Sequence, residues 1–179
     1  MDETTKRRKA VSGVGRRLGA TRRWLAGGVL GLTACSAHAV SYVVLDSGIN
    51  PGRRSADPYF SVVTDSDALK EVFGDLHTNQ LPVPPPPEVD FERSVIVVAI
   101  LGQQPTAGYS LHVMRVSREG GTLRAELRID RPPPGRVLAT VVTQPYVMLL
   151  VDRFPGLDTV RFVGENQEVW QTLSLREDE

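Results

Sequence analysis

The chain has 179 residues, enough for one domain with its own hydrophobic core and a targeting segment before it. Its formal net charge of zero hides a separation of charge, because residues 1–34 hold eight Lys or Arg against two acidic residues. The remaining residues carry 13 basic and 19 acidic side chains, a net charge of −6, which excludes the basic surface that nucleic-acid binding needs. A single cysteine, Cys35, excludes an intrachain disulfide, so the domain must be stable through core packing alone.

The first predicted element is an export signal. Arg22 and Arg23 precede nine mainly apolar residues at 24–32, which have the length of a signal-peptide core and are too few to span a bilayer stably. Leu32-Thr33-Ala34-Cys35 then resembles the lipobox of bacterial lipoproteins, in which the chain is cut before the cysteine and the thiol is lipidated. We therefore predict a lipoprotein signal peptide at 1–34, a lipid anchor on Cys35 and a location in the bacterial cell envelope.

Two alternatives stay open for this segment. Ala37-His38-Ala39 fits an ordinary signal-peptidase site, and cleavage after Ala39 would release a periplasmic or secreted protein. The second alternative is a basic tail with no role in export. Residues 21–25 loosely resemble a twin-arginine signal. Ser36, rather than aspartate, follows the cysteine, which resembles the outer-membrane default of a Gram-negative host.

Residues 35–80 are predicted to form two strands and one helix. The β-forming residues of 41–46 and 59–63 predict the strands. Residues 64–67 supply an N-cap and acidic first-turn side chains for an amphipathic helix of about three turns. Its apolar positions recur at helical spacing: Leu69, Val72, Phe73 and Leu76. The prolines of 81–88 cannot continue a helix or pair in a sheet, so this segment is predicted to be a stiff polyproline II connector.

Residues 89–175 are predicted to form a run of strands. Residues 95–101 are apolar on both faces, which is typical of a central strand covered on both sides. Gly120-Gly121 predicts a tight hairpin before the alternating strand at 123–129. Further strands are predicted at 109–116, 137–142, 146–151, 159–163 and 169–175. The fold class is therefore mainly β, an antiparallel sandwich or partly closed barrel with one amphipathic helix, followed by a loose acidic tail at 176–179.

Catalytic and metal-binding patterns are missing from the sequence. The histidines His38, His77 and His112 have no cysteine or histidine at metal-ligand spacing. There is no nucleophile elbow, no defensible pair of catalytic carboxylates and no glycine-rich phosphate loop. We therefore expect a binding protein rather than an enzyme, with no metal and no cofactor.

The connection at 101–109 is the candidate partner-binding loop. Pro105 fixes its own φ and Gly108 can take a positive φ, so the loop should hold one shape. Thr106 can cap the turn through its hydroxyl, and Tyr109 offers an apolar ring with a polar tip, which suits partner binding. The alternative is that Tyr109 packs under its own loop and that the glycine serves only turn geometry.

Short motifs over about 88–163 together resemble the C-terminal domain of the PrcB family, the protease complex subunit PrcB. They are Val89-Asp90-Phe91, the apolar strand, the 102–109 loop, Pro134-Gly135 and 142–146 (Val-Thr-Gln-Pro-Tyr), although Ala107 stands where the family often has glycine. The resemblance implies a non-catalytic lipoprotein that assembles with, or stabilises, a surface or secreted protease. We hypothesise that a protein partner contacts these residues of the 89–175 domain: Pro105, Thr106, Gly108 and Tyr109, with Gln144, Pro145 and Tyr146 near them.

Residues 104–109 are also similar to the Asn-Pro-Thr-Thr-Gly-Tyr loop of chagasin-like inhibitors of cysteine proteases. Gln104 replaces the asparagine and Ala107 the second threonine. Those inhibitors have an immunoglobulin-like sandwich and insert this loop into a protease cleft, so the likeness supports the predicted fold. Two functions remain as alternatives to a protease accessory subunit: a protease inhibitor that inserts the 104–109 loop, and a structural protein of the envelope.

Overall fold

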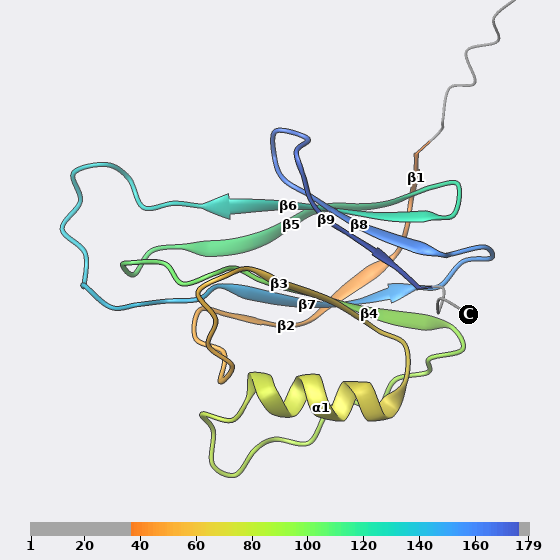
Figure 1. Cartoon of the computed structure of the whole chain (residues 1–179), viewed down its shortest axis with the longest axis horizontal. Coiled ribbons are helices and arrows are strands. Elements are labelled where there is room, and N and C mark those ends of the chain that lie inside the picture. Colours follow the sequence, from red (N-terminus) through yellow and green to blue (C-terminus); the bar gives the residue numbers. More distant parts are fainter. Residues whose placement is uncertain (1–36, 176–179) are drawn as a thin grey trace, which may run out of the picture. The chain divides into compact units, whose positions relative to one another are not determined.

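The structure is a computed structural model of the chain that describes residues 37–175 (Figure 1). The predicted signal peptide, the lipid anchor on Cys35 and the acidic tail at 176–179 lie outside the described residues. The described residues form one compact unit, and all the elements below belong to it.

Nine strands of the described residues form two sheets that pack face to face (Figure 1). One sheet has the strand order β1-β5-β6-β8-β9 and the other the order β2-β7-β4-β3. The bounds are β1 (His38–Ala39), β2 (Tyr42–Gly48), β3 (Tyr59–Val63), β4 (Ser94–Ile100), β5 (Ser110–Glu119), β6 (Thr122–Asp130), β7 (Tyr146–Asp152), β8 (Thr159–Val163) and β9 (Val169–Ser174). Because the sheets do not close on each other, the predicted sandwich is confirmed and the barrel alternative is not.

One pair departs from the antiparallel expectation. β6 and β8 are hydrogen-bonded neighbours that run parallel, whereas every other pair of strands is antiparallel. Between them the chain crosses to the other sheet, runs back through β7 and re-enters beside the start of β6. β7 of the opposite sheet therefore returns the chain to the end at which β6 begins, so that β8 can run parallel to β6. A crossover helix has the same role between parallel strands in α/β folds.

The two-sided burial of β4 confirms its prediction as a central strand. β4 lies between β7 and β3, and every residue of 95–100 is almost fully buried. The odd-numbered residues pack in the core between the sheets, whereas the even-numbered residues pack on the face that the helix covers. The main partners of the second set are Leu69, Phe73 and Leu76 of the helix and Met148 of β7.

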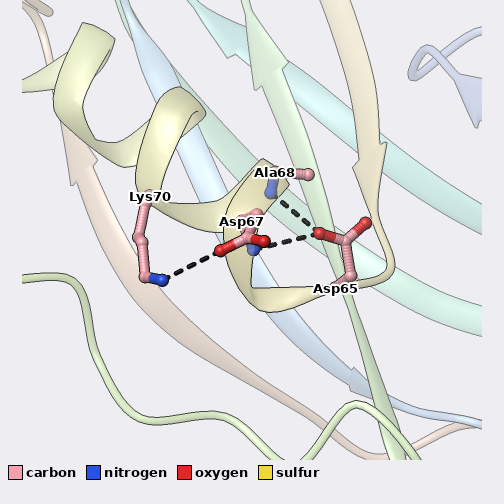
Figure 2. A network of polar contacts seen from close by, with 4 residues as sticks. All are labelled: Asp65, Asp67, Ala68 and Lys70. Atoms are coloured by element: carbon pink, nitrogen blue, oxygen red, sulfur yellow. Dashed lines mark hydrogen bonds and ion pairs between the residues drawn. The ribbon is translucent and has the colours of Figure 1, made fainter.

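The helix α1 (Ser66–Leu76) covers the outer face of the β2-β7-β4-β3 sheet (Figure 1). The Asp65 carboxylate accepts hydrogen bonds from the backbone N–H of Asp67 (3.0 Å) and of Ala68 (2.8 Å), and Lys70 pairs with Asp67 (Figure 2). These bonds satisfy two of the free N–H groups at the helix start, where a negative charge is also favoured. The predicted N-cap and amphipathic helix are therefore confirmed.

Two other predictions have different outcomes. The strand predicted at 137–142 is wrong: these residues cross from one sheet to the other, without a neighbouring strand, and Val137 is 97% exposed. Residues 81–88 form neither helix nor strand. The domain boundaries at 80 and 89 stay a prediction, but strands from both sides of them share a sheet, since β2 pairs with β7 and β3 pairs with β4.

Candidate functional site

Three connections meet at one end of the sandwich, on the left in Figure 1, and we call this the loop end. They are residues 49–58 between β2 and β3, residues 101–109 between β4 and β5, and residues 131–145 between β6 and β7. The strand registers bring them together, because β2, β4 and β6 all end on this side and β3, β5 and β7 all start on it.

The 101–109 loop is held by the 131–145 crossover. Gln104 and Thr143 exchange both backbone hydrogen bonds, at 2.7 and 3.0 Å, and the Thr143 hydroxyl donates to the Thr106 carbonyl at 3.0 Å. The Ala107 N–H donates to the Ala139 carbonyl at 3.2 Å. Four hydrogen bonds between two irregular segments give the loop a defined shape without regular secondary structure.

Two glycines make this close packing possible. Gly108 has a φ of +93°, and a Cβ there would lie 3.2 Å from the Cβ of Pro132, so the predicted positive φ is confirmed. At Gly102 a Cβ would lie 2.2 Å from the carbonyl oxygen of Ala56. The absence of a side chain at Gly102 therefore lets the 101–109 loop touch the 49–58 loop.

Gln144 joins the crossover to the 49–58 loop. It is only 4% exposed, and its side-chain amide pairs with the backbone of Ser55. Nε2 donates to the Ser55 carbonyl at 3.1 Å, and Oε1 accepts from the Ser55 N–H at 3.3 Å. The backbone N–H of Gln144 also donates to the Ile49 carbonyl at 2.7 Å. The Gln144 side chain thus links the 131–145 crossover to the 49–58 loop and supports both.

Tyr146 is a second buried support. It is 7% exposed, and its hydroxyl donates to the Asp46 carboxylate at 3.0 Å. His77, which follows α1, contacts the same Asp46 oxygen at 3.0 Å through Nε2 and the Phe73 carbonyl at 2.8 Å through Nδ1. Burial, together with the charge of Asp46 and its hydrogen bond, raises the pKa of the Tyr146 hydroxyl well above its usual value, so this hydroxyl is a neutral donor.

The seven predicted contact residues therefore divide into two groups. Pro105 and Gly108 are exposed, and Thr106 and Tyr109 are half-buried. The other three are buried and bonded inside the fold: Gln144, Pro145 and Tyr146. The structure brings the two groups to the same end, but only the first group presents surface that a partner can reach.

The crossover adds exposed apolar side chains that sequence reasoning missed. Its exposed large hydrophobic residues are Val137, Val141 and Val142, and Ile49 is exposed on the neighbouring loop. We expected 137–142 to be a strand, which would have placed some of these valines in a sheet. The three prolines and the glycine at 132–135 were the signal that could have identified an irregular crossover instead.

A cleft of about 470 Å³ also opens beside the loop end, between the edge strands β3 and β9. Its apolar lining includes Phe60 and Trp170, whose ring centroids lie 6.3 Å apart. Arg131 and Glu168 are among its polar residues, and Glu168 accepts a hydrogen bond from the Trp170 indole at 3.1 Å. Sequence reasoning did not find this cleft, because its residues come from four separate segments.

The described residues hold one serine–histidine–aspartate cluster, on β5 and β6. His112 contacts both the Ser110 hydroxyl, at 2.9 Å, and the Asp130 carboxylate, at 3.2 Å, through the same Nε2 atom. A catalytic triad needs the serine and the carboxylate on opposite nitrogens of the ring, so this cluster does not have the geometry of a triad. Between 37 and 175 no three histidine, cysteine or acidic side chains lie close enough to hold a metal ion, and no helix is long and apolar enough to cross a bilayer.

Comparison with known proteins identifies the segment that carries this end. Residues 95–152 match the family model described as PrcB C-terminal. No curated protein and no solved structure matches the chain. The matched segment runs from β4 to β7 and contains both the 101–109 loop and the 131–145 crossover. The part of the chain that builds most of the loop end thus matches the PrcB C-terminal model, which supports the resemblance that the sequence motifs indicated.

Proposed function

We propose that this protein is a non-catalytic, lipid-anchored accessory subunit of the cell envelope that binds a surface or secreted protease through its loop end. The observation that carries the proposal is the PrcB C-terminal match, because it spans two of the three connections at this end. Binding residues are commonly found on loops that a rigid scaffold positions, and these loops have that arrangement.

The exposed residues of the loop end are the proposed contact surface. Pro105 and Gly108 form part of it, and the apolar side chains of Val137, Val141 and Val142 enlarge it. Apolar side chains surrounded by polar loops are the usual content of a protein-binding patch. The buried Gln144, Pro145 and Tyr146 act indirectly, since they hold the exposed residues in place.

The position of β1 supports cleavage before Cys35 over cleavage after Ala39. His38 and Ala39 pair with Arg118 and Ser117 of β5, and the Val40 N–H donates to the Val116 carbonyl at 3.1 Å. A chain that began at Val40 would lose β1 from the edge of its sheet. A chain that began at Cys35 keeps β1, as a folded lipoprotein would.

Affinity capture tests the proposal. The chain from Ser36 is immobilised and exposed to an envelope extract of the source organism, and retained proteins are identified by mass spectrometry. A Pro105→Ala/Val137→Asp variant perturbs the contact surface, and Met114→Asp is the matched control, because Met114 is 50% exposed on β5, away from the loop end. Retention of a protease by the parent and the control, but not by the loop variant, is expected. If the parent retains no protease, the accessory-subunit function is wrong.

One observation also favours inhibition as a second candidate function. The 104–109 segment carries the exposed Pro105, and its loop contacts two further loops at the same end, so that a protease cleft would meet three loops together. Assays of papain with micromolar concentrations of the chain from Ser36 test this candidate. Unchanged hydrolysis rates would rule out inhibition of this class, whereas competitive inhibition that Pro105→Ala weakens would support it.

A further inference from the structure

The described chain starts at the end of the sandwich opposite the loop end. β1 pairs with the last residues of β5, with His38 opposite Arg118, whereas the 101–109 loop leads into the first residue of β5 (Figure 1). The Gly120–Gly121 hairpin and the 153–158 connection lie at the same end as β1, because β5 and β7 finish there. We call this the tether end.

The separation of the two ends follows from strand geometry. β5 has ten residues, and an antiparallel strand rises about 3.4 Å per residue, so the loop end lies about 30 Å from the tether end. In the sequence only Ser36 and Ala37 separate Cys35 from β1. Three Cα–Cα steps span at most about 11 Å, so an anchor on Cys35 would hold β1 close to the membrane surface.

We propose that the tether end faces the lipid bilayer and that the anchored protein presents its loop end to the aqueous compartment, about 30 Å from the lipid headgroups. This inference rests on the lipid anchor of the proposed function. The proposed orientation also restricts the partner. The partner's binding face must lie away from the membrane surface, as in a soluble protein or in the projecting domain of a membrane-anchored protein.

The surface next to the tether fits a bilayer interface. The first residues of the edge strand β2 are exposed and lie three to five residues after the end of β1: Tyr42, Val43 and Val44. A tyrosine ring with a polar tip suits the headgroup level of a membrane. Exposed apolar side chains beside a lipid anchor bury additional apolar area at the membrane surface and so strengthen its binding.

The polar residues of the tether end are compatible with headgroups rather than with hydrocarbon. The Arg93 side chain is 87% exposed, and its carbonyl accepts a 2.8 Å hydrogen bond from the Arg153 N–H. Both arginines line one shallow depression together with Glu92 and Asp152. The mixed charges neither attract nor repel an anionic surface strongly, so the short tether determines the orientation.

Energy transfer from tryptophan to the bilayer tests the orientation. The chain from Cys35 contains one tryptophan, Trp170, and one thiol, which can be coupled to maleimide lipids in phosphatidylcholine vesicles. In a Trp170→Phe background, Pro155→Trp places a reporter at the tether end and Val137→Trp places one at the loop end; both positions are exposed. Dansyl groups on lipid headgroups accept the energy, and transfer falls steeply with distance.

Transfer is expected to be several-fold more efficient from position 155 than from position 137. A flexible insert of about 20 residues after Ser36 reaches roughly 25 Å and should reduce the difference. Equal transfer, or stronger transfer from position 137, would overturn the proposed orientation and leave protease binding untouched. Chemical coupling makes this readout independent of lipidation in cells. The mass of Cys35-containing peptides from cells tests lipidation separately, and an unmodified thiol would remove the anchor on which the inference depends.

Discussion

Substitution of Gln144 tests how the loop end is built. A residue that supports the loops and a residue that contacts the partner directly should respond differently to it. Gln144→Ala removes two hydrogen bonds to the Ser55 backbone, and little water reaches the site, since Gln144 is 4% exposed. At about 1 kcal/mol net for each bond, and more where a buried partner stays unpaired, the free energy of unfolding should fall by about 2–3 kcal/mol. A direct contact residue would change partner binding and leave that free energy nearly unchanged.

Urea unfolding measures this difference. The fall should appear as a lower midpoint with an unchanged slope, since the surface exposed on unfolding stays the same. Gln103→Ala is the matched control, because Gln103 is an exposed glutamine on the adjacent 101–109 loop and its loss should change the free energy of unfolding by less than about 0.5 kcal/mol. If Gln144→Ala lowers the free energy of unfolding no more than this control does, Gln144 does not support the two loops. The original hypothesis that Gln144 contacts the partner directly would then be favoured.

Three further predictions concern single supports of the fold. Gly108→Ala should lower stability by about 1–2 kcal/mol, because φ is +93° and Pro132 leaves little room for a Cβ; an unchanged thermal midpoint would contradict this. Asp65→Ala should cost about 1 kcal/mol of stability by urea unfolding through loss of the N-cap, whereas Glu71→Ala, on the exposed side of the helix, serves as the neutral control. The raised pKa of Tyr146 adds stability that is fully present below about pH 10, the tyrosine pKa of the unfolded chain, and is lost as the pH rises above it. Ultraviolet titration should therefore show a tyrosine ionisation above the usual pH range that Tyr146→Phe removes; a titration curve that loses no such late step on this substitution would contradict it.

Local patterns in the sequence were sufficient to predict most of the helical and strand segments. The apolar run at 95–101 indicated a strand buried on both faces, and the structure places it between two strands and under a helix. The spacing of the apolar residues and the N-cap Asp65 predicted the helix correctly, because both signals depend on only a few neighbouring residues. The predicted β3 and β8 have the bounds that the structure shows.

The loop end was harder to predict because long-range contacts decide its shape. The sequence motifs located the 101–109 loop and 142–146, and the structure joins them through Gln104 and Thr143. No local pattern shows that Gln144 points inward to Ser55, 89 residues away. The valines of 137–142 have strong β propensity, but propensity gives no partner strand, and tertiary context left them exposed.

The loop end depends on residues outside the PrcB C-terminal segment. The 49–58 loop, which Gln144 holds from one side, is held from the other side by α1 and the residues after it. The Gly52 N–H donates to the Leu76 carbonyl at 2.6 Å, and the Asn79 amide donates to the Asn50 carbonyl at 3.0 Å. Segment 95–152 alone therefore supplies two loops but neither the third loop nor its support. Since β2, β3 and α1 complete the same sheet and cover its outer face, the residues before 95 help to set the shape of the surface that a partner meets.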